Sequence, residues 1–459
     1  MRLNRYAVAL AAGCCATAAQ ANALLDVYQQ ALANDKTFQA AQFQRDAALQ
    51  AKPLAIANLL PQIGAQGSYT EEESNSSYSS ARFGSTTSGT VDQDSDGNTT
   101  AYSVSLTQAI FDWSSIQKLR QSTDQVALAE TSYRASQQDL ILRVATAYFN
   151  VLAAADTLRF SQAENQAVGR QLEQSKQRFE VGLSAITDVQ EAQARYDLTV
   201  ASLITAETAL SSARRVLAET TGGTDSAGAA VPEDMPLAGP DPQTPATWIE
   251  AARKDNLSVL AARLQTEIAK KDIQIARAGH LPTLSLQAGY NNSSGDSTIT
   301  TTAGGATSTS DSPQDSDGTS IGLVAKLPLF AGGAVRANVK AASSTSSQRQ
   351  ALLESATRTA ERQTGDAYQG VLSGIARVKA FKQAVISSKT ALEASEVGLQ
   401  VGARTSIDVL NAQQQLYSAE RDYARARYDY LLSVLQLKAN AGRLAEADLA
   451  EIDRLLVGG

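Results

Sequence analysis

The chain has 459 residues and a net charge of −7 at pH 7, and aromatic residues make up 5% of it. The negative charge argues against a nucleic-acid partner, because nucleic-acid-binding chains present clustered positive charge to phosphates. Beyond the first 23 residues no stretch reaches the ~18 consecutive apolar residues of a membrane-spanning helix, and the composition favours long, closely packed helices over one thick globular core.

Residues 1–23 form the first predicted segment, an export signal that is absent from the mature chain. Two arginines precede an apolar run, and Ala21-Asn22-Ala23 supplies a small-residue cleavage site. Removing the signal also removes Cys14 and Cys15, the only cysteines, so the mature chain has no thiol for a disulfide or a metal. An alternative makes Cys14 a lipid-anchored residue, but the preceding apolar run is short and its leucine lies one place too far upstream.

The rest of the chain repeats itself at an offset near 220 residues. Tyr148-Phe149-Asn150-Val151-Leu152, for example, recurs as Tyr368-Gln369-Gly370-Val371-Leu372. Between the copies lies a stretch that holds five of the ten prolines and is typical of an extended linker. We therefore predict a first structural repeat over 24–221, a linker over 222–247, a second repeat over 248–441 and a C-terminal tail over 442–459.

Each repeat is predicted to contain a helix, a β-hairpin, a very long helix, a tight tip and a returning helix. Alternating apolar and polar residues predict the β-hairpins over 61–111 and 282–330. Within them, stretches rich in Gly, Ser, Thr and Asp at about 84–100 and 304–319 predict solvated loops. The helices are predicted over 24–57, 112–181 and 184–221 in the first repeat and over 246–279, 333–401 and 405–441 in the second.

The longest predicted helices have ~70 residues and would be about 105 Å long, which does not fit inside a globule ~30–40 Å across. They must form a coiled coil or a wall. Four amphipathic strands in an exported chain suggest part of a β-barrel wall in an outer membrane. Four strands cannot close a barrel, and open edges in hydrocarbon leave backbone groups unpaired, so several chains must share one barrel of 8, 12 or 16 strands.

Two similar stretches, Val181 to Gln193 and Val401 to Gln413, lie where the long helices end. In each, a glycine (Gly182 or Gly402) follows the helix at a position free to adopt positive φ, and a Ser or Thr then lies where the next helix needs an N-cap. Both stretches therefore predict the tight tip of a helical hairpin. An aspartate follows in the first turn of each returning helix, where the helix dipole favours it.

These features resemble the TolC family of outer-membrane exit ducts. The resemblance rests on the duplicated hairpins, on the Leu-Pro pairs before the strands, on the tip motif Val401 to Leu410 and on Ala426 to Leu431, and it covers nearly the whole mature chain. It implies an α+β membrane protein in which each duplicated chain gives four strands to a trimeric 12-stranded β-barrel in outer-membrane lipid. A long periplasmic α-helical barrel would continue from it.

The resemblance also implies a function and partners. The homotrimer would be the outer-membrane channel of a tripartite efflux pump or a type I secretion system. It would dock onto a periplasmic adaptor (a membrane fusion protein) and an inner-membrane pump or ABC exporter. The alternative is a periplasmic adaptor with a coiled-coil hairpin, but an adaptor carries one such hairpin and this chain carries two.

By the same resemblance, the tips form a periplasmic gate. Arg404 would link to acidic partners such as Asp188, and Asp408 would ring the lumen. Three symmetric copies of a carboxylate at a constriction favour cations and raise one another's pKa. The chain departs from the family's best-known gate at Asn411, where a second carboxylate is usual, and at Leu399, where an aromatic residue is usual. The alternative role of the two aspartates is to support their helix starts.

No catalytic or cofactor-binding constellation is recognisable, so we expect a passive conduit rather than an enzyme, with no cofactor and no metal. The segment Asp92 to Gly97 begins like a calcium loop, but Ser103 occupies the twelfth position and the segment joins strands, so a solvated surface loop is the prediction. His280, the only histidine, has no thiol or acidic pair near it in sequence and is predicted to be structural.

Overall fold

The computed structural model describes residues 24–81, 88–223, 228, 231–232 and 234–457, so the export-signal and lipid-anchor predictions lie outside the described residues. The chain divides into two compact units, and each takes segments from both sequence repeats. The sheet unit comprises Asp46–Ala129 and Ala262–Leu352, and the core unit comprises Met1–Arg45, Glu130–Ala261 and Leu353–Gly459.

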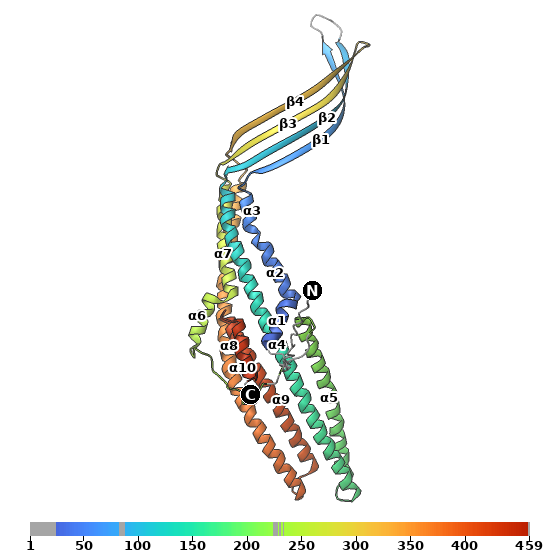
Figure 1. Ribbon diagram of the computed structural model, residues 1–459, viewed down its shortest axis with the longest axis vertical. Helices are drawn as coiled ribbons and strands as arrows, with labels where there is room; N and C mark the ends of the chain where they lie inside the picture. Colours follow the sequence, from blue (N-terminus) through green and yellow to red (C-terminus); the bar gives the residue numbers. More distant parts are fainter. Residues whose placement is uncertain (1–23, 82–87, 224–227, 229–230, 233, 458–459) are drawn as a thin grey trace, which may run out of the picture. The chain divides into compact units, whose positions relative to one another are not determined.

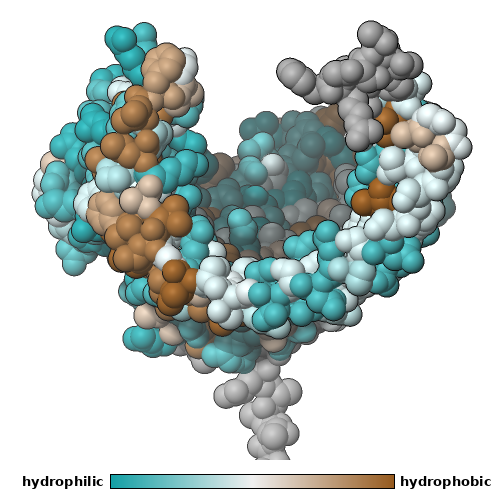
Figure 2. Space-filling model, turned by 90° about the horizontal axis from the view of Figure 1, so that it is seen from above, coloured by the Kyte–Doolittle hydropathy of each residue, from teal (hydrophilic) through white to brown (hydrophobic). Residues whose placement is uncertain are grey.

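The sheet unit contains one antiparallel sheet of four strands in the order β1-β2-β3-β4 (Figure 1). The strands are β1 (Gln62–Ala81), β2 (Ser88–Phe111), β3 (Thr283–Ala303) and β4 (Ala306–Lys326). The pairing of β2 with β3 joins the hairpins of the two repeats into one sheet. Seen from above, the sheet curves around a hollow (Figure 2).

The predicted loops at 84–100 and 304–319 are largely wrong, because residues 88–100 and 306–319 are strand; residues 84–87 of the first loop lie outside the described residues. In the second hairpin the turn shrinks to Gly304 and Gly305, both at positive φ, as a two-residue hairpin turn requires. The acidic segment expected as a surface loop, Asp92 to Gly97, lies in β2. A strand that is polar on both faces has the composition of a loop, so hydrophobic periodicity cannot reveal it.

Five of the described helices lie wholly within the core unit: α1 (Leu24–Asn34), α5 (Ile186–Thr221), α6 (Pro245–Asp255), α9 (Ser406–Asn440) and α10 (Glu446–Val457). The remaining described helices are α2 (Lys36–Leu49), α3 (Ala51–Ala57), α4 (Trp113–Glu180), α7 (Leu257–Ala278) and α8 (Ala334–Gln400). The two very long helices predicted from sequence are therefore present as α4 and α8, with 68 and 67 residues.

The helices expected as single pieces over 24–57 and 246–279 are interrupted, and corresponding residues interrupt them. Asp35 lies between α1 and α2, and its Oδ1 accepts a 2.6 Å hydrogen bond from the backbone N–H of Phe38. Asn256 lies between α6 and α7, and its Oδ1 accepts from the N–H groups of Ser258 and Val259 at 3.0 and 3.2 Å. Each side chain caps the helix that follows it, which allows the chain to turn there without unpaired N–H groups.

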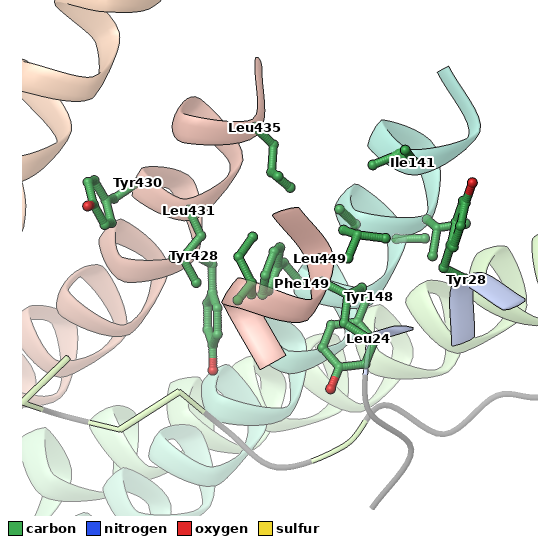
Figure 3. Packing of buried hydrophobic residues seen from close by; sticks show 14 of the residues in the cluster. Leu24, Tyr28, Ile141, Tyr148, Phe149, Tyr428, Tyr430, Leu431, Leu435 and Leu449 are labelled. Carbon is green, nitrogen blue, oxygen red and sulfur yellow. The ribbon is translucent and has the colours of Figure 1, made fainter. Parts of the chain in front are cut away.

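The core unit is built around aromatic side chains from α4 and α9 (Figure 3). The rings of Phe149 and Tyr428 are stacked with their centroids 5.9 Å apart, and Tyr148 meets Phe149 edge to face at 5.7 Å. The hydroxyl of Tyr428 donates to Asp156 Oδ2 at 2.7 Å, and the hydroxyl of Tyr148 accepts from the N–H of Gly228 at 3.1 Å. These aromatic residues therefore bury large apolar surfaces while their polar atoms stay paired.

The C-terminal stretch 442–459, predicted as a tail, contains α10 and is part of the core. Leu449 of α10 is fully buried in the aromatic cluster. The carboxylate of Asp453 accepts hydrogen bonds from the backbone N–H groups of Leu24 and Leu25 at 2.7 and 2.8 Å. A carboxylate at these free N–H groups satisfies two donors at the start of α1 and suits the helix dipole. Helix α10 thus holds the start of α1 in place.

Among the described helices, α4 is the one whose length and composition would allow it to cross a membrane, and 61% of the apolar window concerned is buried. Leu140, Val144 and Phe149 of α4 lie in the core cluster. Packing inside the core unit therefore accounts for the apolar character of this helix.

We predict that alkaline pH weakens the core. Burial raises the pKa of Tyr148 to about 12, above the usual value of 10.0. Because the folded pKa is raised, this residue's stabilisation is complete below about pH 10 and is lost as the pH rises through about 12. The melting temperature, followed by circular dichroism in detergent, should fall across that window, and Tyr148→Phe should make the fall shallower.

Tyr69→Phe is the matched control, since this tyrosine is exposed in β1. Its melting temperature should change with pH as in the parent chain. If Tyr148→Phe kept the same pH dependence as the parent, burial of this hydroxyl would not contribute to the alkaline transition.

Candidate functional site: the hairpin tips

Two tight turns end the helical hairpins of the core unit. The first joins α4 to α5 and the second joins α8 to α9 (Figure 1). Gly182 and Gly402 follow α4 and α8 with φ of 76° and 77°. The next residues turn back to bond the helix end: the N–H of Leu183 donates to Arg178 O at 2.7 Å, and that of Ala403 donates to Gly398 O at 2.8 Å. Positive φ at these positions favours glycine.

The two tips differ at the start of the returning helix. In the second tip Thr405 is the N-cap: its hydroxyl accepts from the N–H of Asp408 at 3.3 Å, and Asp408 Oδ2 accepts from the N–H of Thr405 at 2.9 Å. This reciprocal pair is a capping box. In the first tip the N-cap is Ala185, which has no side-chain cap, so the predicted Ser cap is absent there. The Ser184 hydroxyl instead donates to Ser175 O at 3.4 Å.

The Asp408 carboxylate is held in its charged form by this capping geometry. Hydrogen bonds from the Thr405 backbone and hydroxyl lower the pKa of Asp408, and the nearby charge of Arg404 adds a smaller effect in the same direction. The tip of α9 therefore carries a fixed negative charge at neutral pH. Within one chain, the geometry of Asp408 matches the helix-supporting role considered above.

Within a single chain, Arg404 lies near Asp408 but is not paired with Asp188, its predicted acidic partner, among the described residues. Arg404 is exposed and Asp188 is half-buried. Asn411, in contrast, has a definite partner, because Arg195 Nη2 donates to its Oδ1 at 2.8 Å. This bond connects α5 to α9, which means that the two hairpins are linked where the family's second carboxylate is replaced. No repeat or motif in the sequence indicated Arg195.

Further contacts join the two hairpins on the helix faces behind the tips. Ser406 is buried, and its hydroxyl accepts from Gln171 Nε2 at 3.2 Å and lies 3.4 Å from the hydroxyl of Ser175. Farther from the tip, Arg421 Nη1 lies 2.7 Å from Glu164 Oε2, with 9% of the glutamate side chain exposed. A small apolar cluster fills the space between these polar contacts and consists of Val168, Leu172, Ala192 and Leu410.

These contacts bind α4 and α5 to α9 in one chain, while Arg404 is exposed and Asp188 is half-buried at the tips. The residues that form them are Gln, Ser, Glu and Arg at ordinary helical spacing, so sequence patterns could not single them out. In the described part of the chain, no three His, Cys, Asp or Glu side chains are arranged to hold a metal ion.

Comparison with known proteins extends this picture. The chain matches the family described as outer membrane efflux protein over residues 27–223 and 248–443. It is 38% identical to outer membrane protein TolC of Vibrio cholerae over 448 residues, which cover 97% of this chain and 96% of that one. It is 30% identical to the alkaline protease secretion protein AprF of Pseudomonas aeruginosa, with 95% and 88% of the two chains covered.

Solved structures share the fold at low sequence identity. The CusC channel has a TM-score of 0.71 with 17% identity, and 92% of each chain is covered. The outer membrane protein VceC of Vibrio cholerae has a TM-score of 0.70 with 19% identity, covering 91% of this chain and 96% of that one.

The two matched segments of the family fall on the two sequence repeats, one on each side of the linker. The match therefore includes both hairpin tips and both strand pairs. Together with the identity to relatives over nearly their whole length, it decides against the periplasmic adaptor that the sequence left as an alternative. The chain is an outer-membrane protein and belongs to the outer membrane efflux protein family.

Proposed function

We propose that three copies of this chain form an exit duct that spans the outer membrane and is closed at its hairpin tips. The observation that carries the proposal is the curved sheet with one apolar face and two unpaired edges. Within the described sheet, β1 and β4 are the outer strands, so each has a neighbour on one side only. Both edges expose backbone N–H and C=O groups along 20 or 21 residues.

Such edges are incompatible with lipid unless another sheet pairs with them, because each unpaired group in hydrocarbon costs several kcal/mol. Pairing β4 of one copy with β1 of the next satisfies both edges and generates a closed, symmetric barrel. Three copies give 12 strands, which is the number that the resemblance to the TolC family implies. The curvature of the sheet supports closure in this direction (Figure 2).

The long helices supply the second part of the duct. With 68 and 67 residues, α4 and α8 would each reach about 100 Å. Such a length suits a conduit across the periplasm that meets a periplasmic adaptor and an inner-membrane pump or exporter. Relatives named for efflux and for protease secretion support both kinds of cargo, small molecules and polypeptides.

The gate of this duct would lie at the tips and would work between copies. Arg404 is exposed and Asp188 is half-buried, and we propose that each contacts a neighbouring copy. The capping box keeps the Asp408 carboxylate charged, and three such carboxylates at the constriction favour cations. Arg195, bonded to Asn411, would hold the two hairpins of each copy in register as the tips meet.

The native mass of the protein extracted from the outer membrane in detergent tests the assembly. A mass near three times that of the mature chain is expected, since only three copies close 12 strands. A monomer in the soluble periplasmic fraction would contradict the duct, because the sheet edges would then never need closure.

We predict that Leu323→Arg impairs membrane assembly. Leu323 lies on the apolar sheet face and is 64% exposed. A charge on the lipid side of a barrel costs about 2–4 kcal/mol near the membrane midplane. The amount of heat-modifiable trimer in outer-membrane fractions measures the effect. Ser320→Arg is the control, because Ser320 lies close by on the opposite face of β4, and normal trimer in both variants would count against this lipid face.

We predict that Arg404→Ala raises single-channel conductance in planar bilayers, because it removes a cation that joins neighbouring tips. Arg358→Ala is the matched control: this arginine pairs with Glu354 on the exposed surface of α8, far along the helix from the tip. Unchanged conductance in Arg404→Ala would remove Arg404 from the gate without affecting the barrel.

A further inference from the structure

The strand register sorts the side chains of the sheet onto two faces. The pairs Ile63↔Leu106, Val104↔Tyr290 and Ala288↔Ile321 place one apolar set on a single face, and residues two apart along each strand share it. The opposite face contains Glu72, Ser74 and Ser95, which line the hollow of the curved sheet. We call the first the convex face and the second the concave face.

The convex face changes character abruptly along the strands. Near the helices it carries an apolar band, and its large members are exposed: Ile63 by 72%, Val104 by 47% and Ile321 by 79%. Beyond Tyr69, Thr100 and Thr319 the same face becomes acidic. Its carboxylates in this second band are Glu71, Glu73, Asp92, Asp94, Asp96, Asp296, Asp311, Asp315 and Asp317.

The concave face of the second band is polar too, but almost uncharged. It carries mostly Ser, Thr, Gln and Gly together with Tyr78, Val91 and Ile299, and Glu72 is the one carboxylate that the register of the described strands places there. The outer end of the sheet is accordingly coloured mostly white to teal in Figure 2. The convex face of the second band is therefore suited to water, whereas the convex face of the first band is suited to hydrocarbon.

The strands are also too long for the membrane alone. They contain 20, 24, 21 and 21 residues. At ~3.3 Å per residue and a tilt of ~40°, such strands extend about 50–60 Å along the membrane normal. The apolar belt of a barrel is only ~25 Å tall and needs about 9–11 residues per strand. About half of each strand therefore lies outside the apolar belt.

We infer that hydrocarbon covers only the apolar band and that the outer half of the sheet projects from the cell as a rigid β collar. The inference rests on the proposed function, since it requires the sheet to be a barrel in the outer membrane. The acidic residues set the boundary, because carboxylates on the lipid side of a barrel are unfavourable and stay in water. The duct thus opens well above the lipid surface, through a wall that is acidic outside and neutral inside.

Cysteine labelling tests the collar. The only cysteines lie at positions 14 and 15, so single cysteines introduced after residue 23 report without background once the signal is removed. Asp94→Cys and Thr300→Cys lie on the convex face of the collar, Val104→Cys lies in the apolar band, and Thr187→Cys lies at the first hairpin tip. Each is treated with a membrane-impermeant maleimide in intact cells and after cell disruption without detergent.

The expected result is that both collar variants are labelled in intact cells, that Val104→Cys stays unlabelled before and after disruption, and that Thr187→Cys is labelled only after disruption. If the collar variants remain unlabelled while the other two behave as expected, the collar is wrong and the duct stands. If Val104→Cys is labelled after disruption, no lipid covers the band and the proposed function itself fails.

Discussion

Backbone hydrogen bonding in the sheet is the constraint on which the rest of this structure depends. Each repeat provides two strands, and the pairing of β2 with β3 satisfies one edge of each hairpin within the chain. The outer edges of β1 and β4 stay open, and hydrocarbon does not tolerate them. Because each duplicated chain provides four strands instead of two, a barrel of given size needs half as many chains. Its closure still requires pairing between symmetry-related copies.

The core unit meets a different requirement, which is to hold several long helices together with little aromatic content. It does so with one concentrated cluster around Phe149 and Tyr428 and with the chain ends. Helix α10 is part of this core, because its Asp453 carboxylate accepts a hydrogen bond at the start of α1 and its Leu449 is buried in the cluster. Away from that cluster, the hairpins are joined by small polar contacts such as Gln171 with Ser406.

Much of the fold could be read from local patterns. The alternation of apolar and polar residues located the apolar ends of all four strands, next to the helices. Gly182 and Gly402 marked turns that need positive φ. The outer halves of the strands were missed because Ser, Thr and Asp on both faces give no alternation. The breaks at Asp35 and Asn256 were missed because apolar spacing continues across them, while a single Asx side chain caps the next helix.

The sequence by itself determined the duplication, because the two copies can be aligned directly. It also determined the hairpin tips, the very long helices and the amphipathic strands, because each depends on residues close together in the chain. Only the tertiary structure decided which side chains meet across the repeats. Arg195 donates a hydrogen bond to Asn411, 216 positions away, and the backbone N–H of Leu24 donates to Asp453, 429 positions away. Such pairs follow from how helices pack rather than from any period in the chain. The same packing turned Asn411, a departure from the family's gate, into a link between hairpins.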